Sequence, residues 1–234
     1  MKICLIPARG GSKRIPRKNI RAFRGKPMIA WSIAAAHASK CFDKVLVSTD
    51  DQEIAEVACD YGAEVPFLRP AHLSDDQAST QAVIAHALEW VEQQGGVCEA
   101  LCCLYATAPF VQADDLRQSQ QQLMSSRPGT VVFAATSFPF PIQRAIHLDA
   151  QGYAAMFQPE CFSSRSQDLK EAYHDAGQFY WATPETWSKV TNLFEGMRPL
   201  LLPRWRVQDI DTEEDWQRAE LLHQLLSEQG LING

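Results

Sequence analysis

The stretch Met1-Lys-Ile-Cys-Leu-Ile-Pro-Ala-Arg-Gly-Gly-Ser-Lys-Arg-Ile-Pro-Arg-Lys-Asn19 decides how the chain begins to fold. Residues 3–8 form the short apolar run that a buried parallel strand requires, and they lead into a Gly10-Gly11 turn rich in Arg and Lys. Glycine lets backbone N–H groups approach phosphate oxygens closely, and long cationic side chains neutralise the phosphate charge. This strand and loop therefore predict a site for a small polyanion.

The charge of the chain is unevenly distributed. Eight of the 22 basic residues fall between Arg9 and Lys26, and none of the 28 acidic residues does, although the net charge is −6. A protein that binds nucleic acid would present a basic face overall, so this pattern favours a small phosphorylated ligand instead. The glycine spacing matches neither a P-loop nor a dinucleotide-binding fingerprint. The alternative is a solvated basic turn, but eight like charges would repel one another there without an anion.

The length and composition are those of a soluble globular protein. At 234 residues the chain can bury a full core, and we expect a single domain over residues 1–234. No stretch approaches the roughly 20 apolar residues that cross a bilayer, and the N-terminus lacks the apolar segment of a signal peptide. A cytoplasmic protein without membrane contact is therefore expected.

The seven cysteines are an odd number without a paired pattern. This favours buried reduced thiols over disulfides or a metal site. Cys102 and Cys103 are adjacent in a strand-like run, so their side chains should point to opposite faces of a sheet.

Strand-like and helix-like segments alternate over the first two-thirds of the chain. Strands are expected at residues 3–8, 45–48, 100–105, 130–136, 200–202 and 207–210, and helices at 27–38, 52–61, 81–94, 114–125 and 213–228. Strands separated by helices of this length imply parallel βαβ units in a doubly wound sheet. The alternation stops at Phe138-Pro-Phe-Pro141 and resumes at about Gln178. We therefore expect an irregular insertion at about 138–175, serving as a lid or a dimerisation arm.

An acidic cluster, Gln208-Asp-Ile-Asp-Thr-Glu-Glu-Asp215, lies near the end of the chain. In a strand, Asp209 and Asp211 would project from the same face and could share a hard divalent cation. Thr212 and Asp215 suit the start of the following helix. Capping does not need both Asp209 and Asp211, so metal binding and helix capping remain alternative explanations.

A third motif, Tyr173-His-Asp-Ala-Gly-Gln-Phe-Tyr-Trp181, combines polar and aromatic side chains around a glycine. Phe179 and Trp181 could form the inward face of a strand. His174, Asp175 and Gln178 could hydrogen-bond a polyhydroxylated ligand. A lone histidine is more often structural, so His174 is not assigned as a catalytic base.

The segment Ile6-Pro-Ala-Arg-Gly-Gly-Ser-Lys13, followed by Lys18-Asn19, closely resembles the opening signature of the CMP-sugar-acid synthetases. These are cytidylyltransferases that act on nine-carbon α-keto acids. Further matches follow in the same order along nearly the whole chain: Ser48-Thr-Asp50, Leu68-Arg-Pro70 with the polar run to Thr80, Thr107-Ala-Pro109 and Asp209-Ile-Asp211. The sialic-acid enzymes carry Gln where this chain has Tyr105, and the segments 105–110, 162–168 and 173–181 resemble the pseudaminic acid branch.

The resemblance implies a three-layer α/β/α sandwich on a mixed, mainly parallel sheet, of the nucleotide-diphosphosugar-transferase type. It implies a homodimer in which the arm reaches over the neighbouring subunit. It also implies that CTP and pseudaminic acid are converted, with Mg²⁺, to CMP-pseudaminic acid and pyrophosphate.

The same resemblance assigns roles to individual residues. CTP would be held by Arg9, Gly11, Ser12, Lys13, Lys18, Asn19, Arg69, Ser79 and Thr80. The sugar acid would be held by Tyr105, Thr107, Arg165, His174 and Gln178, and Arg165 would meet its carboxylate. Asp209 and Asp211 match the magnesium ligands, and Arg9, Lys18 and Asp211 would act in catalysis.

Two other functions fit the same motifs. One is a CMP-synthetase for another sugar acid, such as N-acetylneuraminic, legionaminic or 3-deoxy-octulosonic acid. The other is a non-catalytic CTP-binding sensor on the same fold, against which the presence of both Asp209 and Asp211 argues.

Overall fold

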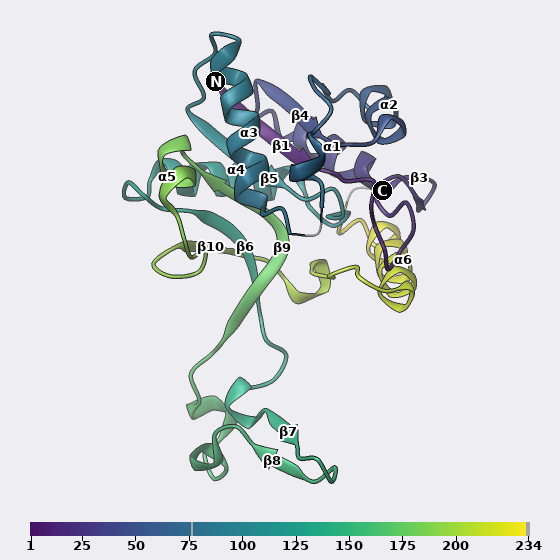
Figure 1. Ribbon diagram of the computed structural model, residues 1–234. Coiled ribbons are helices and arrows are strands. Elements are labelled where there is room, and N and C mark those ends of the chain that lie inside the picture. The colour runs from purple at the N-terminus through teal and green to yellow at the C-terminus, as the bar shows by residue number, and fades with distance from the viewer. Residues whose placement is uncertain (76, 233–234) are drawn as a thin grey trace.

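The computed structural model describes residues 1–75 and 77–232, and its centre is a six-stranded sheet with the order β10-β6-β9-β5-β1-β4 (Figure 1). The strands are β1 (Lys2–Pro7), β4 (Lys44–Ser48), β5 (Ala100–Leu104), β6 (Val132–Ser137), β9 (Tyr173–Ala182) and β10 (Arg198–Leu201). β1 is parallel to β4 and β5, and β10 is parallel to β6, whereas β9 is antiparallel to both of its neighbours. The sheet is mixed and mainly parallel, which confirms the expected fold class.

Helices cover both faces of this sheet. They are α1 (Met28–Ser39), α2 (Gln52–Asp60), α3 (Thr80–Gln93), α4 (Ala113–Met124), α5 (Pro184–Lys189) and α6 (Glu213–Glu228). α1, α2 and α4 bury apolar side chains against one face, and α3 and α5 cover the other. α6 packs outside α1, where Trp216 and Leu226 join Phe23 and Trp31 in a third cluster. None of the helices in the described part of the chain has the length and apolarity that a membrane span requires.

β1 is apolar at every central position because both of its faces are buried. Cys4 and Ile6 belong to the core beneath α1, and Ile3 and Leu5 to the core beneath α3. Cys102 and Cys103 are divided between the same two cores, so the adjacent thiols point to opposite faces as predicted. Burial raises the pKa of the Cys103 thiol to about 12, as expected of a thiol that serves as a small apolar side chain.

The predicted helices agree with the observed ones within one residue at each end. At the start of α6, Thr212 and Asp215 form the predicted capping box. At the start of α3, the cap is Ser79, whose hydroxyl accepts a hydrogen bond from the Ala82 N–H, and Thr80 is the first helical residue. The short helix α5 was not predicted.

The predicted strand over residues 207–210 is wrong. After β10 the chain makes a 3₁₀ turn at Arg204–Arg206 and reaches α6 without regular structure. Val207 and Ile210 make apolar contacts without forming a strand. Val207 packs against the core beneath α1, and Ile210 is buried in the cluster around α6. Asp209 and Asp211 are therefore not presented from one face of a strand.

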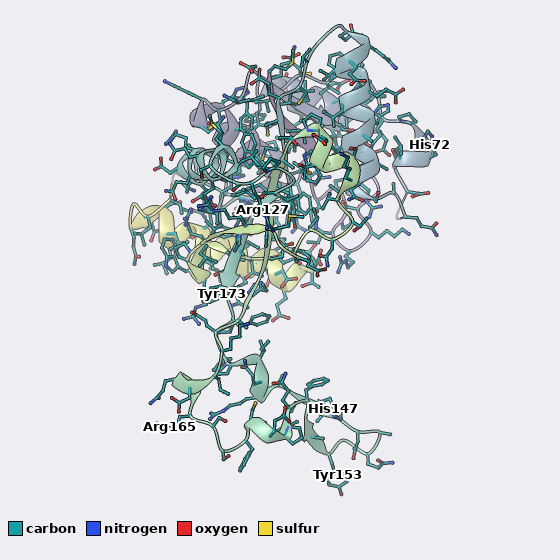
Figure 2. The ribbon with its side chains drawn as sticks, turned by 90° about the vertical axis from the view of Figure 1, so that its left-hand side faces the viewer. His72, Arg127, His147, Tyr153, Arg165 and Tyr173 are labelled. Carbon is teal, nitrogen blue, oxygen red and sulfur yellow. The ribbon has the colours of Figure 1, made fainter. Side chains whose placement is uncertain are left out.

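Residues 138–172, here called the arm, connect β6 to β9 and project away from the body (Figures 1 and 2). The arm is more regular than expected, because β7 (Ile146–Leu148) and β8 (Ala154–Met156) pair as an antiparallel hairpin. β9 begins at Tyr173, earlier than about Gln178, because its first half pairs with the end of β6. The remaining short elements are β2 (Ala22–Phe23), β3 (Lys26–Pro27) and the 3₁₀ turns Ala71–Leu73, Ile142–Arg144, Pro159–Cys161 and Ser166–Asp168.

Candidate active site

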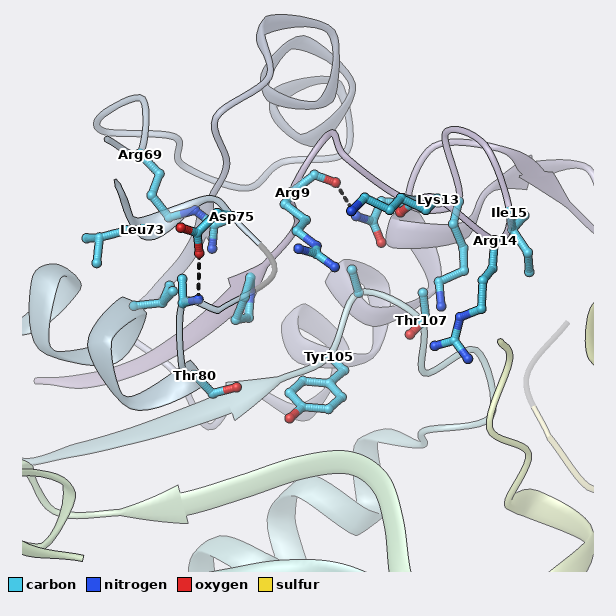
Figure 3. A pocket seen from close by; sticks show the side chains of 17 residues that line it. Arg9, Lys13, Arg14, Ile15, Arg69, Leu73, Asp75, Thr80, Tyr105 and Thr107 are labelled. Atoms are coloured by element: carbon cyan, nitrogen blue, oxygen red, sulfur yellow. Dashed lines mark hydrogen bonds between the residues drawn. The ribbon is translucent and has the colours of Figure 1, made fainter. Parts of the chain in front are cut away.

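A pocket of about 310 Å³ lies at the carboxyl ends of β1 and β5 (Figure 3). Three segments line it: the loop after β1, the chain that leads into α3, and the residues that follow β5. Because parallel strands present their carboxyl ends at one edge, this is where open α/β sheets bind ligands.

Most of the residues predicted to hold CTP line this pocket, together with two of those predicted for the sugar acid. They are Arg9, Ser12, Lys13, Lys18, Asn19, Arg69, Thr80, Tyr105 and Thr107. Arg14, which was not predicted, also lines it. Gly11 and Ser79 do not line it: Gly11 is exposed, and Ser79 caps α3.

The loop after β1 is attached to the end of β4. The Gly10 N–H donates to the Asp50 carboxylate at 2.9 Å. The Arg17 guanidinium donates twice to Asp51, at 2.5 and 3.0 Å, and this pairing lowers the pKa of Asp51. A Cβ at Gly10 would lie 2.7 Å from the Asp51 carboxylate, whereas a Cβ at Gly11 would meet nothing within 4 Å. Close packing therefore requires glycine at position 10 and not at position 11.

The cluster of eight basic residues serves two purposes. Arg17 pairs with Asp51 and Glu53, Arg21 pairs with Glu213, and Lys26 lies 3.4 Å from the centre of the Trp31 ring. These cations make contacts within the protein and do not line the pocket. Those that line it are Arg9, Lys13, Arg14 and Lys18. Acids from distant parts of the sequence thus relieve the repulsion within the loop.

Arg69 adds a buried cation to the pocket wall. Its side chain is only 4% exposed, and its guanidinium lies 3.9 Å from the Asp50 carboxylate. Burial lowers the pKa of Arg69, an effect that Asp50 opposes. Its Nε finds no hydrogen-bond partner among the residues the structure describes. A buried guanidinium with an unused N–H can bind a further acceptor group.

The acidic cluster meets the basic loop. Asp211 Oδ1 lies 2.8 Å from the Arg14 guanidinium and 3.5 Å from Lys18 Nζ. Lys18 Nζ also donates to the Ile210 carbonyl at 2.6 Å. Partial desolvation, and then the neighbouring charge of Asp211, raise the pKa of Asp209. The two carboxylates are therefore close enough to repel one another at the edge of a cationic pocket.

A buried ion pair positions this acidic segment. The Arg206 guanidinium donates to the two oxygens of Asp115 at 2.6 and 3.0 Å, and both side chains are largely buried. The Gln178 amide donates to the Arg206 carbonyl at 2.7 Å. Bidentate pairs of this kind are geometrically specific, so they determine where the chain runs toward Asp209 and Asp211. Sequence reasoning missed Arg206 and Asp115 because neither belongs to a motif.

Three predicted sugar-site residues do not line the pocket within one chain. Gln178 is buried and holds Arg206. His174 contacts the Asp175 carbonyl at 2.8 Å and lines a separate hollow beside α6. Arg165 lies on the arm, where it pairs with Asp168 at 3.0 Å, far from the body (Figure 2).

The sandwiched sheet, with a cationic pocket and two carboxylates at its edge, defines a nucleotidyltransferase. Two solved structures share the fold. CMP:2-keto-3-deoxy-manno-octonic acid synthetase complexed with CTP has a TM-score of 0.70 at 17% identity, covering 96% of this chain and 98% of that one. 4-Diphosphocytidyl-2C-methyl-D-erythritol synthase from Anaerococcus prevotii has a TM-score of 0.64 at 14% identity, covering 95% and 98%.

Residues 3–180 match the cytidylyltransferase family. The chain belongs to this family and is a CTP-dependent cytidylyltransferase. A pseudaminic acid cytidylyltransferase of Campylobacter jejuni is 47% identical over 224 residues, which are 95% of this chain and 96% of the relative. A CMP-N,N'-diacetyllegionaminic acid synthase of Legionella pneumophila is 33% identical over 230 residues, 97% of each chain.

The two glycines of the loop provide a matched pair of variants. Gly10→Ala should lower the free energy of unfolding by about 1–3 kcal/mol, because the new methyl group overlaps Asp51 and forces the loop to move. Gly11→Ala should change it by no more than about 0.5 kcal/mol, since the space there is open. Urea denaturation measures both values. An equal loss in the two variants would contradict the packing described for Gly10.

Proposed function

We propose that the chain transfers the cytidylyl group of CTP to the anomeric hydroxyl of pseudaminic acid, giving CMP-pseudaminic acid and pyrophosphate. The main support for this reaction type is the contact between the basic loop and Asp211. Asp211 Oδ1 lies 2.8 Å from the Arg14 guanidinium and 3.5 Å from Lys18 Nζ. A phosphate-binding loop and a carboxylate pair then act on one triphosphate. The choice of sugar acid is supported by the 47% identity to a relative that is named for pseudaminic acid.

CTP would occupy the pocket with its triphosphate along the loop after β1. Arg9, Ser12, Lys13 and Lys18 line this side. Asn19 is buried, and its amide donates to the Arg9 carbonyl at 2.9 Å, so we assign it to holding the loop in shape. Arg69 and Thr80, on the opposite side, would contact the nucleoside.

The carboxylates suit Mg²⁺. Partial burial, and then the charge of Asp211, raise the pKa of Asp209, and a divalent cation would relieve the repulsion between the two carboxylates. No group of three or more His, Cys, Asp or Glu side chains suited to a metal occurs in the described part of the chain. Mg²⁺ is commonly held by one or two carboxylates together with water and substrate phosphates, so Asp209 and Asp211 would suffice. When bound, the ion would withdraw negative charge from the phosphates and favour loss of pyrophosphate.

The cationic side chains of the pocket would contribute to the reaction electrostatically. CTP and the sugar acid are both anionic, so their repulsion must be screened before the hydroxyl can attack the α-phosphorus. Arg9 and Lys18 would provide this screening and then stabilise the charge on the departing pyrophosphate. The Lys18 ammonium group is positioned by its hydrogen bond to the Ile210 carbonyl and by its ion pair with Asp211. Tyr105 and Thr107 lie where the sugar acid would enter, after β5.

We also propose that the chain is one domain whose arm mediates a homodimer. The arm carries large exposed apolar side chains, which soluble monomers seldom expose together: Phe140, Ile146, Leu148, Tyr153, Phe157 and Phe162. Arg165, remote from its own pocket, would then face the neighbouring subunit, where its guanidinium could bind the sugar-acid carboxylate. CTP is a cytoplasmic metabolite, so we place the enzyme in the cytoplasm.

Asp211→Asn should reduce pyrophosphate release from CTP and pseudaminic acid by at least about 100-fold, because it removes a charge at the reacting phosphates. Glu214→Gln, which neutralises an exposed carboxylate three residues away, is the matched control and should retain full turnover. Thermal denaturation reports whether both variants are folded. Undiminished release by a folded Asp211→Asn protein would refute the metal assignment.

A panel of sugar acids tests the substrate. With CTP and Mg²⁺, we expect kcat/KM for pseudaminic acid to exceed that for N-acetylneuraminic, legionaminic and 3-deoxy-octulosonic acids by at least about tenfold. A higher value for one of the others would favour a different CMP-synthetase. Binding of CTP without pyrophosphate release from any of them would favour the sensor.

Replacing Phe157 and Phe162 together by Ser should convert a dimer into a monomer, because the apolar surface that drives association is lost. Sedimentation velocity measures the change. Val97→Ser, at an exposed apolar position on the body, is the control and should leave the dimer intact. A monomeric unmodified protein would contradict the proposed role of the arm.

A further inference from the structure

Polar side chains connect the pocket to the interior of the sheet. Thr80 and Tyr105 line the pocket, and Figure 3 shows their hydroxyl groups directed toward one another. The rings of Tyr105 and Tyr180 are in contact, with centroids 5.6 Å apart, and the Tyr105 hydroxyl interacts with the hydroxyls of Thr80 and Tyr180. The Tyr180 hydroxyl in turn donates a hydrogen bond to the Asp175 carboxylate. Asp175 and Tyr180 are not among the described residues that line the pocket, and Tyr105 connects them to it.

The contact between Asp175 and Tyr180 depends on an irregularity in β9. Residues five apart in a regular strand point to opposite faces. β6 pairs Phe133 with Tyr180 and Ala135 with Asp175, with a shift of register between the two pairs. Because Phe133 and Ala135 are two residues apart on β6, their partners share one face of the sheet. Gly177 makes this possible: its φ of +61° is the left-handed conformation that glycine adopts without strain.

The carboxylate gives the hydrogen-bonded groups one direction. An ionised carboxylate accepts and cannot donate, and each hydroxyl has a single proton. The Tyr180 proton is directed to Asp175. Since Tyr180 has no second proton to give, Tyr105 must be the donor in any hydrogen bond between the two hydroxyls. Burial, and then Tyr105 and Asp175, raise the pKa of Tyr180, which therefore stays protonated. Tyr105 consequently presents lone pairs, and no proton, to the pocket.

The surroundings of this pair are apolar. Tyr180 lies in the core beneath α3 with Phe133, Ala135 and Trp187, and Asp175 is partly buried beside them. A carboxylate and a hydroxyl cost more free energy there than the phenylalanine and alanine that would fill similar space. Asp175 and Tyr180 are connected to the pocket through Tyr105. Orienting the Tyr105 hydroxyl would explain why polar side chains occupy these two positions.

We propose that Asp175 and Tyr180 are positioning residues that hold the Tyr105 hydroxyl as a hydrogen-bond acceptor for a donor group, an N–H or O–H, of the sugar acid. This rests on the proposed function, because it takes the sugar acid to bind beside Tyr105. A ligand that presents a donor at this point gains a hydrogen bond. A ligand that presents only an acceptor leaves two sets of lone pairs facing one another, which disfavours it.

Asp175→Asn and Tyr180→Phe test the proposal through the separate KM values of the two substrates. Each variant should raise KM for the sugar acid about tenfold, because the Tyr105 proton is no longer directed away from the pocket. KM for CTP should stay within about twofold, since neither Asp175 nor Tyr180 lines the pocket and the cations assigned to the triphosphate are left unchanged. Tyr173→Phe is the control: it removes another hydroxyl from β9, one that donates to Glu171 at 2.7 Å, and should change neither constant.

A double variant shows whether the effect passes through Tyr105. Adding Asp175→Asn to Tyr105→Phe should raise KM for the sugar acid by no more than about twofold further, because the group that Asp175 orients is already gone. A full tenfold increase on that background, or equal increases of KM for CTP and the sugar acid, would overturn the proposal. Tyr180→Phe, which retains the shape of the ring, provides the same readout if Asp175→Asn fails to fold.

The choice of sugar acid identifies the donor. If an acylamino N–H meets Tyr105, the variants should affect an N-acylated sugar acid and leave a hydroxyl-only acid unchanged; if a hydroxyl does, both should be affected. An unmodified protein that converts none of the sugar acids would refute the proposed function itself. A fully active protein whose Asp175→Asn and Tyr180→Phe variants keep an unchanged KM for the sugar acid would refute only the positioning role.

Discussion

The contact of Lys18 with Ile210 and Asp211 is the constraint on which the site depends. It joins residues 192 positions apart in the sequence, and it places the acidic segment beside the basic loop. Neither part could do this alone: the loop needs acids to balance its charge, and the neighbouring carboxylates need cations to offset their repulsion. Arg206 and Asp115 hold the same segment from its other side, so the carboxylates are fixed before any ligand arrives.

The balance of charge also explains how a loop with so many cations can fold without its ligand. Arg17 and Arg21 are neutralised by acids of α2 and α6, which leaves only part of the cluster facing the pocket. Ion pairs at a protein surface contribute little to stability individually. The main effect of these pairs is therefore to orient the Arg17 and Arg21 side chains away from the pocket. Because some of the basic residues pair with acids and the others line the pocket, the pocket has one cationic wall. The buried Arg69 extends that wall from a different part of the chain.

Much of this could be predicted from local patterns, and the errors share a cause. Helices were predictable because caps and apolar periodicity are local, as Thr212 and Asp215 illustrate. The segment 207–210 was wrongly predicted as a strand. Val207 and Ile210 are apolar because they pack into two separate hydrophobic clusters. Gly11 was predicted to contact CTP, whereas the close packing of Gly10 against Asp51, a residue far along the chain, was not predicted. The hydrogen bond between Tyr180 and Asp175 across a bulge was likewise not predicted, because it depends on the register of two strands.

The sequence by itself determined the buried strand at the start, the basic loop after it, the order of most helices and strands, and the resemblance to the cytidylyltransferase family. Each of these depends on residues that are near one another in the chain, where spacing and residue type suffice. Only the tertiary structure decided which cations face the pocket, where Asp209 and Asp211 lie, and how Tyr180 comes to meet Asp175. Those outcomes depend on how distant segments cross and on one irregular strand register, because a hydrogen bond or ion pair forms only when packing has brought both partners together.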